Sequence, residues 1–141
     1  MPYKFIEHPA DIAVEVDGNS LEELFKSACY AWREAAMNIS SFNKESSKKF
    51  IFNGTTSEIL LIELLSELNF QLYSKKWVFV TIQNLAIEKT DSDCHIEIEL
   101  FGQTFHPEIH NMKEEIKAIT YHQVKIEKVG NLYKTLIVFD V

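Results

Sequence analysis

The sequence is poor in the residues that mark linkers, repeats and disulfide frameworks. Its 141 residues include only 4 Gly, 3 Pro and 2 Cys. Because no glycine-rich or proline-rich stretch and no repeating period is present, flexible linkers, collagen and solenoids are excluded. Cys29 and Cys94 lie far apart without CxxC spacing, so we expect neither a zinc knuckle nor a disulfide framework. Both cysteines are interpreted as reduced core residues.

Positive charge and long apolar runs are also scarce. The chain has 14 Lys and Arg against 21 Asp and Glu, a formal net charge of −7. It therefore lacks the basic face with which proteins replace the counterions of nucleic acids, and we expect no direct nucleic-acid binding. No apolar run approaches the roughly 20 residues that span a bilayer, and the N-terminus lacks the apolar core of a signal peptide. These absences predict a cytoplasmic protein without a membrane segment.

Short catalytic motifs are missing as well. The chain contains no dinucleotide-binding glycine loop, P-loop, nucleophile elbow or zinc-protease motif. His106 and His110 have the spacing of a helical metal pair, but Pro107 between them disfavours that helix. The other histidines stand singly and are interpreted as surface or core side chains. Local motifs therefore indicate no enzyme.

Apolar side chains are abundant enough for one core. Hydrophobic residues make up 46% of the chain and aromatic residues 12%. A globular chain of this length buries roughly two-thirds of its unfolded surface. We therefore expect a single domain over residues 1–141.

Periodicity predicts two helices among many strands. Ser20 with Glu23, and Thr55 with Glu58, have the spacing of capping boxes that start helices. The first helix carries an apolar stripe from Leu21 to Ile39, and the second, at 58–73, is apolar too far around its surface to have an open face. Strands are expected at 3–7, 12–16, 48–52, 77–82, 85–89, 94–100, 116–127 and 132–140. The predicted class is α+β, a two-layer sandwich of a mixed β-sheet with two long helices.

Two acidic residues stand out by their positions. Asp11 lies in the expected turn between the first two strands, and Asp140 ends the most apolar strand beside the terminal carboxylate of Val141. Charge concentrated at the edge of a buried sheet is costly unless a cation or hydrogen bonds balance it. A hard cation that prefers oxygen ligands is one interpretation. The alternative is a solvated chain end.

Several segments together resemble the archease family. They are the opening Tyr3–Ile12 with His8-Pro9-Ala10-Asp11, the helix start Ser20–Phe25, the segment Leu60–Leu68, the stretch Glu115–His122 and the ending Val138–Val141. They cover essentially the whole chain in the right order. The combination is specific, whereas any one segment alone is weak.

The resemblance implies a small accessory protein rather than an enzyme. Archeases activate the RtcB-type tRNA-splicing RNA ligase, which uses GTP and a divalent metal, by promoting its guanylylation and multiple turnover. Carried over to this chain, the metal site falls on Asp11, Asp140 and the Val141 terminus, with calcium or magnesium as the ion. Lys117 corresponds to a lysine tied to activation of the ligase.

Two other functions stay open. Some archaeal relatives are linked to a tRNA cytosine methyltransferase as a chaperone-like partner, which is the alternative that the resemblance implies. A small metal-dependent hydrolase built on Asp11, Asp140 and His8 is less favoured, because the sequence shows no general base and no substrate pocket.

Overall fold

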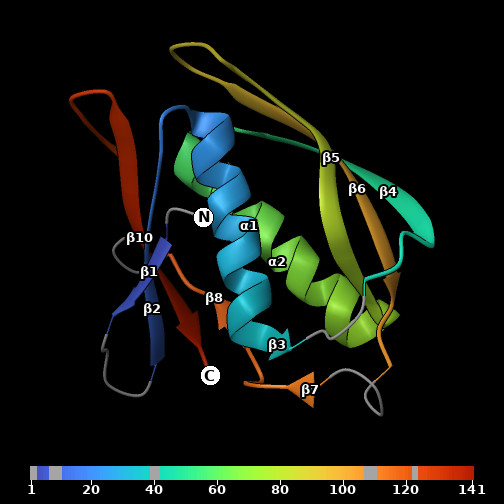
Figure 1. The fold of residues 1–141 in the computed structure, drawn as a ribbon. Helices are drawn as coiled ribbons and strands as arrows, with labels where there is room; N and C mark the ends of the chain where they lie inside the picture. Colours follow the sequence, from blue (N-terminus) through green and yellow to red (C-terminus); the bar gives the residue numbers. More distant parts are fainter. Residues whose placement is uncertain (1–2, 7–10, 39–41, 107–110, 122–123) are drawn as a thin grey trace.

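Two helices lie between two β-sheets in the structure, a computed structural model that describes residues 3–6, 11–38, 42–106, 111–121 and 124–141 (Figure 1). The helices are α1 (Leu21–Ala36) and α2 (Ser57–Lys75).

The first sheet contains β1 (Tyr3–Ile6), β2 (Asp11–Gly18), β10 (Leu132–Asp140) and β8 (Ala118–Ile119) in that order, and β9 (Glu127–Val129) also pairs with β10. The second sheet has the order β4 (Ser46–Gly54), β6 (Cys94–Thr104), β5 (Trp77–Lys89), and a short third sheet pairs β3 (Met37–Asn38) with β7 (Asn111–Met112). The predicted α+β class with two long helices is confirmed. The sheet is not mixed, since every strand pair among the described residues is antiparallel, and the helices have a sheet on each side instead of forming one of two layers.

One predicted helix cap is confirmed and the other is displaced by one residue. The Ser20 hydroxyl accepts a hydrogen bond from the Glu23 amide at 3.1 Å. At α2 the cap is Thr56, whose hydroxyl accepts from the Ile59 amide at 3.2 Å, so the expectation for Thr55 was wrong. Glu58 does not close a capping box, because its carboxylate accepts from the distant Ile126 amide at 3.0 Å.

Both helices also end differently from the prediction. Helix α1 ends at Ala36, because the backbone of Met37 is extended and enters β3; Ile39 lies outside the described residues. Helix α2 continues to Lys75, and Lys76 takes the left-handed conformation with φ of 54°. A residue in that conformation commonly ends a helix.

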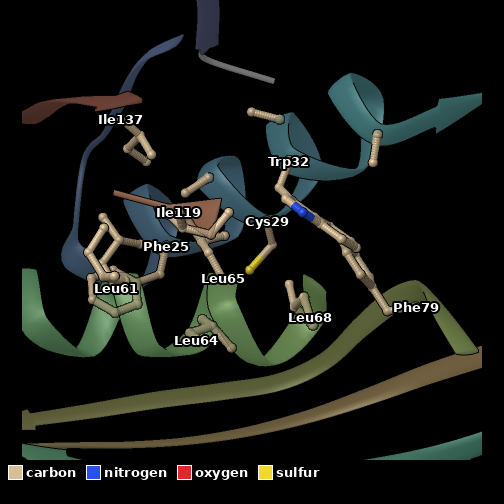
Figure 2. Packing of buried hydrophobic residues seen from close by; sticks show 14 of the residues in the cluster. Phe25, Cys29, Trp32, Leu61, Leu64, Leu65, Leu68, Phe79, Ile119 and Ile137 are labelled. Carbon is tan, nitrogen blue, oxygen red and sulfur yellow. The ribbon is translucent and has the colours of Figure 1, made fainter. Parts of the chain in front are cut away.

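Helix α2 is buried as its sequence predicts. Leu60, Leu61, Leu64 and Leu65 have no solvent exposure. Figure 2 shows their helix beside Phe25 and Trp32 of α1, with strands of both sheets contributing to the same apolar cluster. The helix therefore joins the two sheets through one core.

Two strand predictions were wrong. The stretches 77–82 and 85–89 form one strand, β5, whose pairing with β6 is irregular between Phe79 and Thr81 and between Ile82 and Asn84. The single strand expected at 116–127 is present only as β8 and the start of β9. Parts of the segment between them bond to side chains instead, since the Lys125 amide donates to the Thr135 hydroxyl and the Ile126 amide to Glu58.

The C-terminal hairpin and its central strand are confirmed. Gly130, with φ of 63°, occupies the turn between β9 and β10, where a residue without Cβ is favoured. Strand β10 lies between β2 and β8, and Ile137, Val138 and Phe139 are buried. No helix among the described residues is long and apolar enough to cross a membrane.

Candidate functional site at the end of strand β10

Strand register places the two predicted acids opposite each other. Asp140, the last residue of β10, pairs with Asp11, which is the first residue of β2 rather than part of a turn. Side chains of directly opposed residues lie on the same face of a sheet, a few ångströms apart. Asp11 is half-buried and Asp140 is exposed. Like charges in this arrangement repel, and a cation bound between the two carboxylates would offset that repulsion.

Lys117 reaches the same strand end from the other side of β10. Its amide donates to the Asp140 carbonyl at 2.7 Å, and the next residue, Ala118, is the register partner of Asp140. The Lys117 side chain is exposed, whereas Val141 is half-buried and packs against the core. The fold therefore gathers all four predicted site residues at one end of the first sheet. Their chemical roles stay predictions.

Two polar residues of α2 hold the segment that carries Lys117. The Asn69 amide nitrogen donates to the Ile116 carbonyl at 2.9 Å, and its oxygen accepts from the Trp32 indole nitrogen at 2.9 Å. The Tyr73 hydroxyl donates to the Glu114 carbonyl at 3.2 Å and accepts from the Ile116 amide at 2.9 Å. The three bonds to Glu114 and Ile116 replace a strand ladder just before Lys117, and the bond from Trp32 holds Asn69 in place.

Sequence reasoning missed this pair of positioning residues. Asn69 and Tyr73 are four residues apart, so they lie on the same face of α2. Their signal was the polarity of Asn69 beside a run of leucines, because a polar group on a buried helix needs a partner. That partner lies 47 residues away along the chain, which local patterns do not show.

The environment of Tyr73 keeps its hydroxyl protonated. Burial raises the pKa of Tyr73, the hydrogen bond from the Ile116 amide lowers it in part, and the nearby Glu115 carboxylate raises it. A neutral phenol can both donate and accept. Tyr73 needs both functions to hold Glu114 and Ile116.

An open hollow of about 550 Å³ lies beside Lys117. Asn69, Phe70 and Tyr73 line it from α2, and Ile119 lines it from β8. Phe70 is 49% exposed, so part of the lining is apolar surface that water reaches. Exposed apolar surface beside charged residues is typical of protein interaction sites.

The oxygen donors at this end fit a hard cation better than a transition metal. Asp11 and Asp140 offer carboxylate oxygens, whereas thiolate and imidazole ligands favour softer ions. Among the described side chains, no group of three or more His, Cys, Asp or Glu could hold a metal ion. The two carboxylates would therefore need further oxygen donors to complete a calcium or magnesium shell.

The histidines singled out in the sequence contribute nothing visible to this site. His8, His110 and His122 lie outside the described residues, and His106 is half-buried. His95 belongs to the second sheet, where its Nδ1 lies 2.6 Å from the Asn53 side-chain oxygen and its Nε2 lies 3.5 Å from Glu97. A hydrolase that uses His8 gains no support from the described residues.

Comparisons with known proteins agree along the chain. The family model described as "Archease protein family (MTH1598/TM1083)" matches residues 3–141. The chain is similar to protein archease of Archaeoglobus fulgidus, with 34% identity over 142 residues and all of both chains covered. It is also similar to protein archease of Pyrococcus abyssi, with 35% identity over 127 residues, 90% of this chain and 89% of the relative.

Two solved structures share the fold. The solution structure of protein 1598 from Methanobacterium thermoautotrophicum has a TM-score of 0.85 at 24% identity and covers 99% of this chain and 98% of its own. A crystal structure from Thermotoga maritima, described as an archease and possible chaperone, has a TM-score of 0.60 at 27% identity. It covers 98% of this chain and 96% of its own.

Proposed function

The chain belongs to the archease family, and we propose that it activates an RtcB-type tRNA-splicing RNA ligase by promoting guanylylation and multiple turnover. It acts as a binding protein and not as an enzyme. Its net charge of −7 suits a basic, RNA-handling partner rather than RNA itself.

The observation that carries the proposal is the meeting of Asp11, Asp140 and Lys117 at one strand end. Asp11 opposes Asp140, and the Lys117 amide is bonded to the Asp140 carbonyl. Two acids and one exposed lysine give this end charges of both signs. A lysine ammonium there can pair with a phosphate group at the partner's nucleotide site.

A divalent cation is part of the same proposal. Asp11, Asp140 and the main-chain carboxylate of Val141 would hold calcium or magnesium, both of which prefer oxygen ligands. When bound, the ion supplies positive charge at the strand end. The chain's own contribution is to hold the two carboxylates opposite each other on paired strands.

The direct test is RNA ligation by the cognate ligase under excess substrate, with and without this protein. We expect many turnovers per ligase molecule with the protein present, and neither ligation nor GTP hydrolysis by the protein alone. Turnover that stays unchanged over a wide range of ratios contradicts the proposal.

Two alanine variants distinguish a specific role of Lys117 from a general effect of losing one positive charge. Lys117→Ala should lose most of the activation and keep the melting temperature, because its side chain is exposed. Lys113→Ala is the matched control, since Lys113 is also exposed on the same segment and should keep full activation. If the two variants behave alike, Lys117 is an ordinary surface lysine.

The metal is tested by calorimetric titration with calcium and with magnesium. Asp11→Asn and Asp140→Asn each remove one anionic ligand, and an extension after Val141 converts the main-chain carboxylate into an amide. All three changes should weaken binding of the ion without unfolding β10. Equal binding in the unaltered and altered proteins, or no binding in any of them, shows that the acids form a solvated strand end.

A second function has one observation in its favour. The Thermotoga maritima structure is described as a possible chaperone, which agrees with a specificity factor for a tRNA cytosine methyltransferase. Such a factor would use an exposed surface and need no metal. Methyltransferase stimulation that survives Asp11→Asn, together with unchanged ligase turnover, selects this alternative.

A further inference from the structure

Arg33 lies in the last turn of α1, the helix that runs into β3 in Figure 1, and several aromatic rings surround its side chain. The guanidinium carbon lies 5.0, 4.9 and 4.8 Å from the ring centres of Tyr30, Phe42 and Phe79. Its Nη1 atom donates to the carbonyls of Phe79 at 3.0 Å and Val80 at 2.7 Å. Three rings and two carbonyls therefore fix the plane of this cation.

Arg33 has no carboxylate partner among the described residues. The adjacent Glu34 accepts a hydrogen bond from the Tyr3 hydroxyl instead. Burial lowers the pKa of the Arg33 guanidinium, and the groups that raise it are the phenols of Tyr30 and Tyr3 and the buried thiol of Cys29. A cation withdrawn from water without a counter-charge is costly, so an anion from outside would be favoured there.

The unused donors of Arg33 have the geometry of a binding site. A guanidinium carries five N–H groups, and within the described part of the chain Nη1 alone donates. The remaining Nε and Nη2 groups form one planar edge that matches the two oxygens of a carboxylate. Arg33 also lines an open hollow of about 320 Å³.

The other lining residues indicate what the anion is attached to. Tyr3, Tyr30, Met37 and Phe42 present aromatic and apolar surface to the hollow, and Phe42 is 49% exposed. Of the described residues in this lining, Glu34 is the one carboxylate and Arg33 the one cation. The charges of Arg33 and Glu34 cancel, so a bound monoanion leaves this lining with one excess negative charge, whereas a phosphate dianion leaves it with two and is repelled more strongly.

We propose that the Arg33 hollow binds a monoanionic carboxylate carried on an aromatic or apolar group. The carboxylate lies against the free edge of the guanidinium, and the apolar group contacts Phe42 and Tyr3. A small aryl carboxylate and the acidic side chain of a partner protein share this chemistry. Asp11, Asp140 and Lys117 are not among the described residues that line this hollow.

The test is a nuclear magnetic resonance titration that follows the Arg33 Nε–H signal in the full chain. The probes are phenylacetate, acetate and inorganic phosphate. We expect a saturable shift with phenylacetate, binding about tenfold weaker for acetate because it buries no ring, and little shift with phosphate. A phosphate response as large as that of phenylacetate, or no response to any probe, overturns the proposal. Arg33 then has the structural role of bonding α1 to the backbone of β5.

A peptide pair distinguishes the two sources of the carboxylate. Acetyl-Phe-Asp-amide and acetyl-Phe-Asn-amide differ only in the charge. Preferential binding of the Asp peptide at the strength of phenylacetate or better indicates a partner's side chain. Binding of phenylacetate alone indicates a small-molecule site.

Three variants separate ligand binding from folding. Phe42→Ala removes an exposed ring and should weaken phenylacetate binding about tenfold without unfolding. Glu34→Gln removes the competing negative charge and should strengthen binding severalfold. Arg33→Lys keeps the charge but loses the planar edge, so binding should fall about tenfold or more. Unchanged phenylacetate binding in Phe42→Ala and Glu34→Gln contradicts the proposal even if Arg33→Lys fails to fold.

Discussion

The two larger sheets are held together in different ways, and the proposed metal and activation residues belong to the less regular one. The second sheet has strands of 9, 11 and 13 residues, each paired along nearly its whole length. In the first sheet, β8 has two residues and β9 has three. The segment before β8 is fastened by Asn69 and Tyr73 of α2 instead of a ladder. Regions with few ladder bonds open most easily, which suits a surface that meets a partner.

The largest effect should come from the core between α2 and the second sheet. Leu64 has no solvent exposure and lies on the β5 side of α2 in Figure 2. Leu64→Ala leaves a cavity there and should lower the free energy of unfolding by about 2–5 kcal/mol. Chemical denaturation measures the loss. Ser66→Ala, on the exposed side of the same helix, is the control and should change stability by less than about 0.5 kcal/mol. Similar losses of stability in the two variants contradict a packing role for Leu64 between α2 and the second sheet.

Apart from the two irregularities of β5, the sequence predicted the second sheet better than the segment around β8 and β9, for a physical reason. The alternation from Cys94 to Leu100 matches the buried and half-buried positions of β6, because strand neighbours alone set that pattern. The expected strand at 116–127 failed because Asn69, Tyr73 and Glu58 bond to its backbone, and these contacts join residues far apart in the chain. A hydrophobic pattern does not show which backbone groups a distant side chain will take.

The residues of the candidate site were also predictable to different degrees. Asp11 and Asp140 could be selected from their positions, since each flanks an apolar strand, and β-sheet register then places them opposite each other. Lys117 came only from the family resemblance. The hydrogen bond from the Lys117 amide to the Asp140 carbonyl depends on the path of the segment for which periodicity predicted a single strand.

The second largest effect should come from Asn69. Asn69→Ala leaves the indole N–H of buried Trp32 and the carbonyl of Ile116 without their partner. An unsatisfied buried polar group costs about 1–3 kcal/mol, so the variant should be destabilised by that order. Hydrogen exchange should also increase at Lys117 and Thr120, whose amides bond to β10, more than in β6. Equal increases in both sheets contradict the local role of Asn69.

A smaller and more local effect is expected for Tyr73→Phe. The change keeps the ring and removes the hydroxyl that bonds to Glu114 and Ile116. Stability should fall by about 1 kcal/mol, while ligase activation should fall further than in a control of equal stability loss. A Leu85→Val variant in the second sheet provides that control, because Leu85 is buried far from this segment in the chain. Equal activation in the two variants indicates that Tyr73 acts only on stability.

The smallest effect concerns pH and bears on the first sheet. Burial, the hydrogen bond to Glu34 and the charge of Glu34 raise the pKa of Tyr3, in β1, from 10.0 to about 12. The pKa of Tyr73 is raised mainly by burial. The folded protein therefore retains protons that the unfolded chain releases near pH 10. The stabilisation is complete below pH 10 and is lost as the pH rises toward 12.

The denaturation midpoint, measured at several pH values above 9, should fall more steeply in the unaltered protein than in Tyr3→Phe or Tyr73→Phe. Cys29 contributes to the same fall, because burial raises the pKa of its thiol above the ordinary value of 9.0. Cys29→Ala therefore serves as the background for both tyrosine changes. In that background the two phenylalanine variants should flatten the remaining slope, because each removes a tyrosine whose pKa is raised in the folded protein. A slope that depends on Cys29 alone would place the pH sensitivity in the shared core and remove the distinction between the sheets at high pH.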